Sequence, residues 1–529
     1  MVLYTAQRSV LHRCSLVALA LAGCHTGGAP TDAARAPRVA PLADYQPPAF
    51  VGVDRRAAVL ASRPSIDGIF RSNAEAQHYV GQVWGAVVDG ELVFVDAFGV
   101  ADLDTRLPVD EHTAFHIASL TKSFTSLAIL KLRDDGALSL QDPVARYLPE
   151  LAAVAPLTDD APPIVLAQLM TMTSGLPEDN PWADRQLEDS TDDLRALLAA
   201  GLSFSTVPGS AYEYSNLGYA LLGEVITRVA GRPYQRFITE ELLEPLGMLE
   251  TYWDYDEVPE GQLAVGYRWE DEQWKREPML HTGAYGAIGG LITSLHDMAL
   301  YVGFHLSAWP ARTGPDAGPV RRATVREMHV PTMPRLDAAA RDGAGGPCPA
   351  LVGYGFGLGV RTDCNGLRRV SHTGGLPGFG SNIQFFPDQG IGVISFANLT
   401  YAASSAQHTA ANEALARAGA LVARTLPVPP ALAARARQVA ALVQGWDEAL
   451  ERELLADNVY LDRSRDHRRA EAASIFEAAG AVRSIDAVTP LNQLRGSFVM
   501  RCVNRDVQVT FTQSPERPAR VQRIDLRLL

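Results

Sequence analysis

The sequence is poor in lysine and contains no run of basic residues. Lys122, Lys131 and Lys275 are its three lysines, so arginine supplies nearly all of the 47 positive side chains. The 60 carboxylates outnumber them and give a formal net charge of −13. Because a nucleic-acid-binding surface needs clustered positive charge, we expect no nucleic acid as a partner. The scarcity also draws attention to each lysine, since a buried lysine can act as a neutral base and arginine cannot.

Cysteine is also scarce, and its spacing does not indicate a metal site. The five cysteines show no zinc-type spacing with histidine, and the motif H-E-x-x-H is absent. We therefore expect no metal and no other cofactor. Cys348 and Cys364 could form a disulfide across a loop in an oxidising compartment, and the sequence leaves this pairing open.

Long hydrophobic runs are absent apart from one near the N-terminus. Two arginines precede an apolar stretch at about 14–22, which is too short to span a bilayer as a mature helix. The run ends in L-A-G-C at 21–24, which resembles the lipobox of bacterial lipoproteins. By that resemblance, residues 1–23 are a signal peptide and Cys24 is the lipidated first residue, with an ordinary secretory signal as the alternative. We expect an exported protein, periplasmic or at the cell surface, held at a bacterial membrane by a lipid anchor.

Composition divides the remaining chain into three parts. Residues 24–50 are rich in Gly, Ala, Pro and Thr, which is typical of a flexible tether. Residues 51–425 carry mixed strand and helix patterns and predict one large domain. After a proline-rich segment, residues 431–529 predict helices followed by short strands, a small α+β accessory domain of unknown role.

Strand patterns occur at both ends of the large domain, with helical patterns between them. Residues 83–88 and 92–98, joined by Asp89-Gly90, predict a hairpin with a type I′ turn. Residues 353–360 alternate glycine with larger residues, which predicts a strand with one bare face that another backbone can approach closely. Further strands are predicted at 367–372, 380–386 and 391–397. Between the two sets of strands, the acidic, proline-containing run 178–193 predicts a surface loop. The fold class is therefore α+β, with an antiparallel sheet flanked by helices and an all-helical region between the sheet's two halves.

The stretch 115–130 contains the first candidate catalytic pair. Its apolar residues recur at helical spacing, which predicts a buried helix with Ser119 in its first turn. Lys122 follows one turn later on the same face, so its amine can reach the hydroxyl. A serine with a base within reach is an activated nucleophile. A lone S-x-x-K match is weak, and its significance depends on the motifs that accompany it further along the chain.

Two further motifs occur in order, Y-S-N at 214–216 and H-T-G at 372–374. Together with S-x-x-K, they resemble the serine β-lactamase and penicillin-binding-protein superfamily, in particular its class C β-lactamase-like branch. The resemblance covers about 83–424 and includes the flanking phrase T-S-G-L-P at 173–177. It implies a β-lactamase/transpeptidase-like fold and a metal-independent serine hydrolase that forms an acyl-enzyme.

The resemblance also implies a role for each motif residue. Ser119 would attack an acyl carbonyl, Lys122 would take its proton, and Tyr214 would relay a proton to the leaving group. The division of proton transfer between Lys122 and Tyr214 stays open. Asn216 would orient Lys122 and the substrate, and the oxyanion hole would be the backbone N–H groups of Ser119 and Gly375. The other substrate-binding residues are His372, Thr373 and Gly374.

The third motif departs from that of true β-lactamases and most transpeptidases. Those enzymes have a lysine in first position, which binds the substrate carboxylate, whereas this sequence has His372. Since histidine is only partly charged at neutral pH, we expect a weaker, pH-dependent anchor and poor turnover of β-lactams. The histidine form resembles esterases and D-aminopeptidase-like members, which favours hydrolysis of an ester or amide in a small molecule.

Two alternatives stay open. The first is a cell-wall D,D-peptidase or a β-lactamase proper, with a peptidoglycan-type or lactam substrate. The second is a penicillin-binding sensor that forms an acyl adduct without turnover. The intact Ser119, Lys122 and Tyr214 argue against the sensor.

Overall fold

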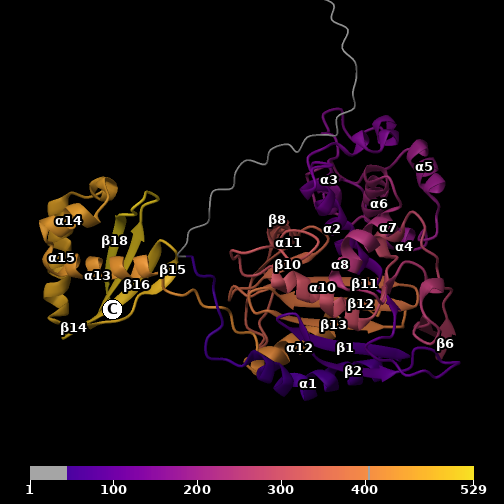
Figure 1. Ribbon diagram of the computed structural model, residues 1–529, viewed down its shortest axis with the longest axis horizontal. Helices are drawn as coiled ribbons and strands as arrows, with labels where there is room; N and C mark the ends of the chain where they lie inside the picture. The colour runs from indigo at the N-terminus through magenta and orange to yellow at the C-terminus, as the bar shows by residue number, and fades with distance from the viewer. Residues whose placement is uncertain (1–44, 403–404) are drawn as a thin grey trace, which may run out of the picture. The chain divides into compact units, whose positions relative to one another are not determined.

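The computed structural model describes residues 45–402 and 405–529 (Figure 1). The predicted signal peptide, the predicted lipidation site Cys24 and most of the predicted tether lie outside the described residues. Within the two described ranges, no helix is both long and apolar enough to cross a membrane.

An eight-stranded antiparallel sheet lies at the centre of the large domain (Figure 1). Its strand order is β2-β1-β13-β12-β11-β10-β9-β8, so strands from the beginning of the domain pair with strands from its end, as predicted. The strands are β1 (Gly81–Val88), β2 (Glu91–Gly99), β8 (Thr332–Asp337), β9 (Ala350–Tyr354), β10 (Gly359–Thr362), β11 (Arg368–Leu376), β12 (Phe379–Phe386) and β13 (Ile391–Ala397).

The hairpin β1–β2 has the predicted turn. Asp89 and Gly90 both have positive φ angles, 51° and 94°. Positive φ at both central residues defines the type I′ turn, whose twist matches that of the flanking strands. The Asp-Gly pair therefore fixes the start of the sheet, as the sequence predicts.

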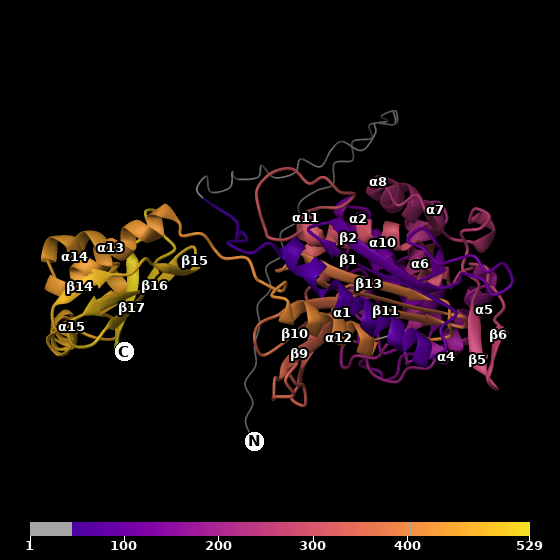
Figure 2. The ribbon, with the colours of Figure 1, turned by 90° about the horizontal axis from the view of Figure 1, so that it is seen from below.

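Helices cover both faces of the sheet. α1 (Arg55–Ala76) and α12 (Ser405–Arg417) pack together on one face, in front of the strands in Figure 2. On the other face, α10 (Leu295–Ser307) packs against β1 and β13, next to the predicted helical region. The remaining helices there are α2 (Thr121–Asp134), α3 (Leu166–Met170), α4 (Asn180–Ala183), α5 (Thr191–Ala200), α6 (Asn216–Ala230), α7 (Tyr234–Ile238), α8 (Glu244–Leu246), α9 (Gly286–Gly289) and α11 (Arg322–Met328).

Two small sheets complete the large domain. One has the strand order β3-β7-β4, made of β3 (Phe115–His116), β7 (Ile292–Thr293) and β4 (Thr251–Tyr252). The other is the hairpin of β5 (Tyr267–Glu270) and β6 (Gln273–Arg276). The helix predicted from residue 115 therefore starts later than predicted. Strand β3 comes first, a single turn η1 (Ala118–Leu120) is next, and α2 begins at Thr121, because pairing with β7 overrides the helical periodicity.

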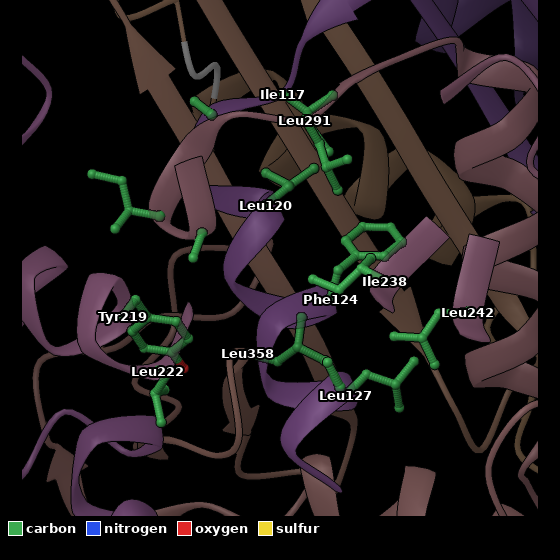
Figure 3. Close-up of a cluster of buried hydrophobic side chains, with 14 of the residues drawn as sticks. Ile117, Leu120, Phe124, Leu127, Tyr219, Leu222, Ile238, Leu242, Leu291 and Leu358 are labelled. Atoms are coloured by element: carbon green, nitrogen blue, oxygen red, sulfur yellow. The ribbon is translucent and has the colours of Figure 1, made fainter. Parts of the chain in front are cut away.

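Helix α2 is buried almost throughout (Figure 3). Phe124 stacks on Tyr301 of α10, with ring centroids 3.9 Å apart. The other apolar neighbours of α2 come from several elements of the helical region and from the loop before β10. The labelled side chains around the helix are Tyr219, Leu222, Ile238, Leu242, Leu291 and Leu358. Packing on all sides fixes the helix and leaves its polar residues, Lys122 among them, inside the core.

The glycine-rich stretch 353–360 brings a second backbone against α2. The prediction of one continuous strand is wrong, since β9 ends at Tyr354 and β10 begins at Gly359. Between them, Gly357 has a φ of 73°. A Cβ atom placed on Gly357 would lie 2.8 Å from both the carbonyl oxygen of Lys122 and the Cα of Ser123. The predicted close approach of another backbone is therefore confirmed, and that backbone belongs to α2.

Residues 430–529 form helices followed by strands, in the predicted order. The helices are α13 (Pro430–Gly445), α14 (Glu448–Leu454) and α15 (Arg465–Ala479). The sheet order is β14-β16-β17-β18, with β15 paired to β16, and its strands are β14 (Val482–Ile485), β15 (Thr489–Asn492), β16 (Arg495–Cys502), β17 (Val507–Gln513) and β18 (Val521–Leu528). The buried apolar residues of this region form a cluster of their own, which an independent accessory domain requires. The domain boundaries stay a prediction.

Cys348 and Cys364 form a disulfide bond, the pairing that the sequence leaves open. The bond joins the segment before β9 to the loop between β10 and β11. Cys502 in β16 is a free, buried cysteine.

Replacing Gly357 by alanine should destabilise the large domain by about 2 kcal/mol or more, because both the positive φ and the added Cβ are unfavourable. Gly366→Ala is the matched control, since Gly366 has a φ of 78° but no atom within 4 Å of an added Cβ. Denaturant unfolding should show the larger loss for Gly357→Ala. Equal losses in the two variants would mean that the approach to α2 contributes nothing.

Candidate active site

Ser119 lies in the turn η1, between strand β3 and helix α2. The residue before it, Ala118, has a φ of 49°, a conformation that costs a non-glycine residue about 1–3 kcal/mol and clusters at functional sites. Gly289 and Gly374 leave room for Ala118, since Cβ atoms added to them would lie 3.4 Å and 3.1 Å from its atoms. The turn presents the Ser119 hydroxyl at the start of α2, where the helix dipole favours developing negative charge.

Lys122 is hydrogen-bonded to Ser119 inside the core. Its Nζ lies 2.9 Å from Ser119 Oγ and donates to the backbone oxygen of Ile288 at 2.8 Å. The side chain is fully buried. Burial lowers the pKa of Lys122 from 10.5 to about 7, against the opposing charges of Asp184 and Asp179. At neutral pH a large fraction of Lys122 is therefore a neutral amine that can accept the Ser119 proton.

Tyr214 completes the set of catalytic side chains that the sequence predicts. The centroid of its ring lies 5.2 Å from Lys122 Nζ. Burial raises the pKa of Tyr214 well above 10, an effect that a hydrogen bond with Ser119 partly offsets. The phenol therefore keeps its proton at neutral pH and can donate it to a leaving group. The structure brings the hydroxyl, the amine and the phenol together in one site.

Asn216 begins helix α6 and is fully buried. Its backbone N–H donates to Asp179 Oδ1 at 2.6 Å, and its Nδ2 donates to Asn180 Oδ1 at 2.9 Å. Its side-chain oxygen has no hydrogen-bond partner among the described residues, and a hydrogen bond to Lys122, which the sequence predicts, is not among their contacts. Because an unpaired buried oxygen is unfavourable, this atom is suited to accept an N–H group of a bound substrate.

His372 is buried and hydrogen-bonded within the protein. Its Nδ1 lies 2.6 Å from the carbonyl oxygen of Thr373, and its Nε2 lies 2.8 Å from the hydroxyl of Tyr354. Since a carbonyl only accepts, Nδ1 carries the ring proton and Nε2 accepts from Tyr354. Burial, with a smaller effect of the charge on Lys122, lowers the pKa of His372 to about 3. The prediction of a partly charged, pH-dependent anchor is therefore wrong, because His372 is neutral at neutral pH.

The rest of the third motif alternates between the two faces of β11. Gly374 faces the turn that carries the nucleophile, since a Cβ there would lie 2.2 Å from the backbone oxygen of Ile117. The Thr373 side chain is exposed, and strand alternation directs it away from the face of His372 and Gly374. In the described sheet, β10 pairs with β11 only as far as Ser371, which leaves the edge around Gly375 open. An open strand edge beside the nucleophile suits the predicted oxyanion donor and an extended substrate.

Two carboxylates near Lys122 were missed in the sequence. Residues 178–193 read as an acidic surface loop, but Asp184 is 5 % exposed, and Asp179 accepts backbone N–H groups at the start of α6, including that of Leu217 at 2.9 Å. Burial raises the pKa of Asp184 to about 6, and the charge of Lys122 opposes the rise. The surface-loop prediction is wrong for Asp184, which is buried, whereas Asp179 is half-buried. Nothing in an acidic run distinguishes a buried carboxylate from a solvated one.

Tyr401 is a further missed residue, and it connects two parts of the site. Its hydroxyl donates to Asp184 Oδ2 at 3.2 Å. Its ring lies against the backbone of Gly375, where an added Cβ would be 2.7 Å from Tyr401 Cδ1. Tyr401 also has a φ of 54°, which is unusual for a residue with a side chain. It therefore joins the third-motif strand to the Asp184 segment, a role that no sequence motif marks.

The chain as a whole has similar counterparts among known proteins. The beta-lactamase family model matches residues 66–418, well over half of the chain. The chain belongs to the beta-lactamase family. The predicted membership of the β-lactamase and penicillin-binding-protein superfamily is thereby confirmed.

The chain spans less than two thirds of the length of the curated relatives it matches. Protein flp of Staphylococcus aureus (strain COL) is 28% identical over 345 residues, which cover 64% of this chain and 63% of that protein. Beta-lactamase-like protein 2 of Dictyostelium discoideum is 31% identical over 252 residues, 46% of each chain.

Solved structures show the same fold. An octameric penicillin-binding protein homologue from Pyrococcus abyssi aligns with a TM-score of 0.53 at 20% identity, over 88% of this chain and 98% of its own. A class C beta-lactamase aligns with a TM-score of 0.54 at 21% identity, over 70% of this chain and 98% of its own. The predicted β-lactamase/transpeptidase-like α+β fold is therefore confirmed.

The pKa of Lys122 predicts how the reactivity of Ser119 depends on pH. Below about pH 7 the protonated amine cannot accept the serine proton, so the rate of labelling by a fluorophosphonate should rise through pH 7. Asp184→Asn removes a charge that raises the pKa of Lys122, and the rise should move to lower pH. Asp192→Asn, which removes an exposed carboxylate of α5, should leave the profile in place. An unmoved or upward-shifted profile for Asp184→Asn would contradict this role.

Proposed function

We propose that this protein is an exported serine hydrolase that cleaves an ester or amide bond through an acyl-enzyme on Ser119. One observation carries the proposal, namely the hydrogen bond of 2.9 Å between Ser119 Oγ and a fully buried Lys122 Nζ whose pKa is lowered to about 7. A serine beside a partly neutral lysine is a nucleophile with its base in place. The neutral phenol of Tyr214 supplies the proton donor that the second half of the reaction needs.

Acylation would use the three side chains in sequence. Ser119 Oγ attacks the carbonyl carbon while Lys122 accepts its proton. The backbone N–H groups of Ser119 and Gly375 would stabilise the oxyanion of the tetrahedral intermediate. Tyr214 then protonates the leaving group and recovers a proton from Lys122. In deacylation a water molecule attacks the acyl carbonyl, the Lys122–Tyr214 pair takes its proton, and Ser119 leaves with that proton.

The charges around the site favour substrates that carry no carboxylate at the third motif. His372 is neutral and already bonded to Tyr354, so it offers no charged partner to a substrate carboxylate. Asp179 and Asp184 add negative charge near Lys122. A substrate carboxylate at the third motif would therefore be repelled, whereas a lysine at position 372 would attract it. This supports the esterase and D-aminopeptidase-like branch over a β-lactamase proper or a D,D-peptidase.

Export and anchoring are the second part of the proposal, and the sequence of residues 1–24 supports them. A lipid on Cys24 would hold the hydrolase at a membrane surface, with residues 24–50 as tether. Such a location gives the enzyme access to substrates outside the cytoplasm.

Ser119→Ala should lower kcat/KM for p-nitrophenyl esters and D-amino-acid amides by about 1,000-fold or more and abolish fluorophosphonate labelling. Ser139→Ala, at an exposed serine beyond the end of α2, is the matched control and should retain both. Wild type should turn over nitrocefin poorly in comparison.

Two results would redirect the proposal. Nitrocefin hydrolysis faster than that of the ester and amide panel would indicate a β-lactamase proper. A fluorescent penicillin that forms a lasting adduct on Ser119, with no ester or amide turnover, would indicate the sensor.

Cys24→Ala should move the protein from the membrane fraction to the soluble exported fraction, because the lipid is its proposed anchor. Cys14→Ala is the matched control, since the signal peptide that contains Cys14 would be removed, and it should leave the protein at the membrane. Immunoblots of the separated fractions measure this. A Cys24→Ala protein that stays at the membrane would rule out lipid anchoring at this residue.

A further inference from the structure

A second cluster of polar side chains lies beside the small sheet β3-β7-β4, outside the Ser119 site. His112 precedes β3, Glu250 precedes β4, and His296 comes after β7 in the first turn of α10. Each offers one ligand atom, and the three atoms lie within 4.8 Å of one another. His112 Nδ1 lies 2.8 Å from Glu250 Oε1, and His296 Nδ1 lies 3.8 Å from Glu250 Oε2. One carboxylate is therefore placed between two imidazoles that come from distant parts of the chain.

A buried carboxylate, Asp297, fixes the positions of these side chains. Asp297 is 1 % exposed, and its Oδ2 accepts from the backbone N–H of Glu250 at 2.7 Å and from the hydroxyl of Thr251 at 2.8 Å. Its Oδ1 lies 3.3 Å from His296 Nδ1. Ser294 Oγ donates to Glu250 Oε2 at 2.5 Å. The bonds to the backbone and the carboxylate of Glu250 are outer hydrogen bonds of the kind that orient carboxylate ligands at metal centres.

The cluster carries an excess of negative charge. Asp110 and Glu111 directly precede His112 in sequence, and Glu250 and Asp297 lie within the cluster. Over the described part of the chain, no lysine or arginine forms an ion pair with any of these four carboxylates. A cation bound between them would offset this repulsion.

We propose that His112, Glu250 and His296 form a binding site for one Zn²⁺ ion, with a fourth position open to water. Two imidazoles and one carboxylate are donors that Zn²⁺ binds well in a tetrahedral arrangement, whereas Ca²⁺ and Mg²⁺ prefer oxygen ligands alone. The expectation of no metal rested on local spacing. His112 and Glu250 are 138 residues apart, so local spacing does not test this site.

The site would hold together the three strands of the small sheet, of which β3 leads to the nucleophile. Thr293 of β7 pairs with Phe115 of β3 on one side and with Thr251 of β4 on the other. A metal ion bound to residues that flank all three strands would resist their separation, because it stabilises only the state in which its ligands are assembled. Since β3 runs directly into the Ser119 turn, the proposed ion is structural and supports the position of the nucleophile from outside the site.

Calorimetric titration of the metal-free, full-length protein with ZnCl₂ tests the site without relying on hydrolysis. Wild type should bind Zn²⁺ and show a higher Tm, and CaCl₂ or MgCl₂ at the same concentration should not reproduce either effect. His112→Gln and His296→Gln should each weaken this binding by about 100-fold and remove the rise in Tm. Binding of Zn²⁺ by cysteines elsewhere in the chain would persist in both variants, which distinguishes it from binding at the proposed site.

His281→Gln is the matched control, because His281 with Asp254 and Asp256 forms a similar group of ligand atoms within 4.8 Å. It should bind Zn²⁺ like wild type. Undiminished binding in both His112→Gln and His296→Gln would overturn the proposal, and so would a loss confined to His281→Gln. Cobalt(II) gives a readout that needs no variant, since wild type should show the strong visible absorption of tetrahedral Co²⁺. If wild type with Co²⁺ showed no more than the weak absorption of octahedral Co²⁺, that result would also overturn the proposal.

Discussion

The burial of Lys122 is the constraint on which the site depends. A pKa lowered from 10.5 to about 7 means that protonation of this amine is about 5 kcal/mol less favourable than in water. Packing of α2 on every side produces this penalty, because it encloses the lysine away from water. An exposed lysine at the same position would stay protonated at neutral pH and could not accept the proton of Ser119.

Two opposing influences set this pKa, and both come from elements far away in sequence. Burial lowers it, while Asp184 and Asp179 raise it. Without the carboxylates the ammonium formed during acylation would lack nearby negative charge. If the carboxylates attracted Lys122 more strongly, its amine would stay protonated at neutral pH. The segment 178–193 is therefore part of the environment that sets the pKa of Lys122, and Tyr401 connects it to the strand that carries the third motif.

Sequence reasoning reached the residues whose role depends on local spacing. Ser119 and Lys122 are three apart, and the hairpin at Asp89-Gly90 depends on backbone preferences of two residues. It failed where contacts between segments distant in sequence determine the local structure or the charge of a residue. Residues 115–116 form a strand because β7 lies beside them, and His372 is neutral because the surrounding fold buries it. The cluster of His112 with Glu250 and His296 joins residues that no local pattern connects.

The change at the third motif and the two carboxylates belong to the same electrostatic arrangement. A lysine in place of His372 would repel the charge on Lys122, as the effect of Lys122 on the pKa of His372 already indicates, and would lower the pKa of Lys122 further. With a neutral histidine bonded to Tyr354, Lys122 is the one cation among the three motifs, and Asp184 and Asp179 are the charges it feels most. A site balanced in this way can keep its base near neutrality without a substrate carboxylate. In the proposed function, recognition would then depend on hydrogen bonds from the open edge of β11 and from the unpaired oxygen of Asn216.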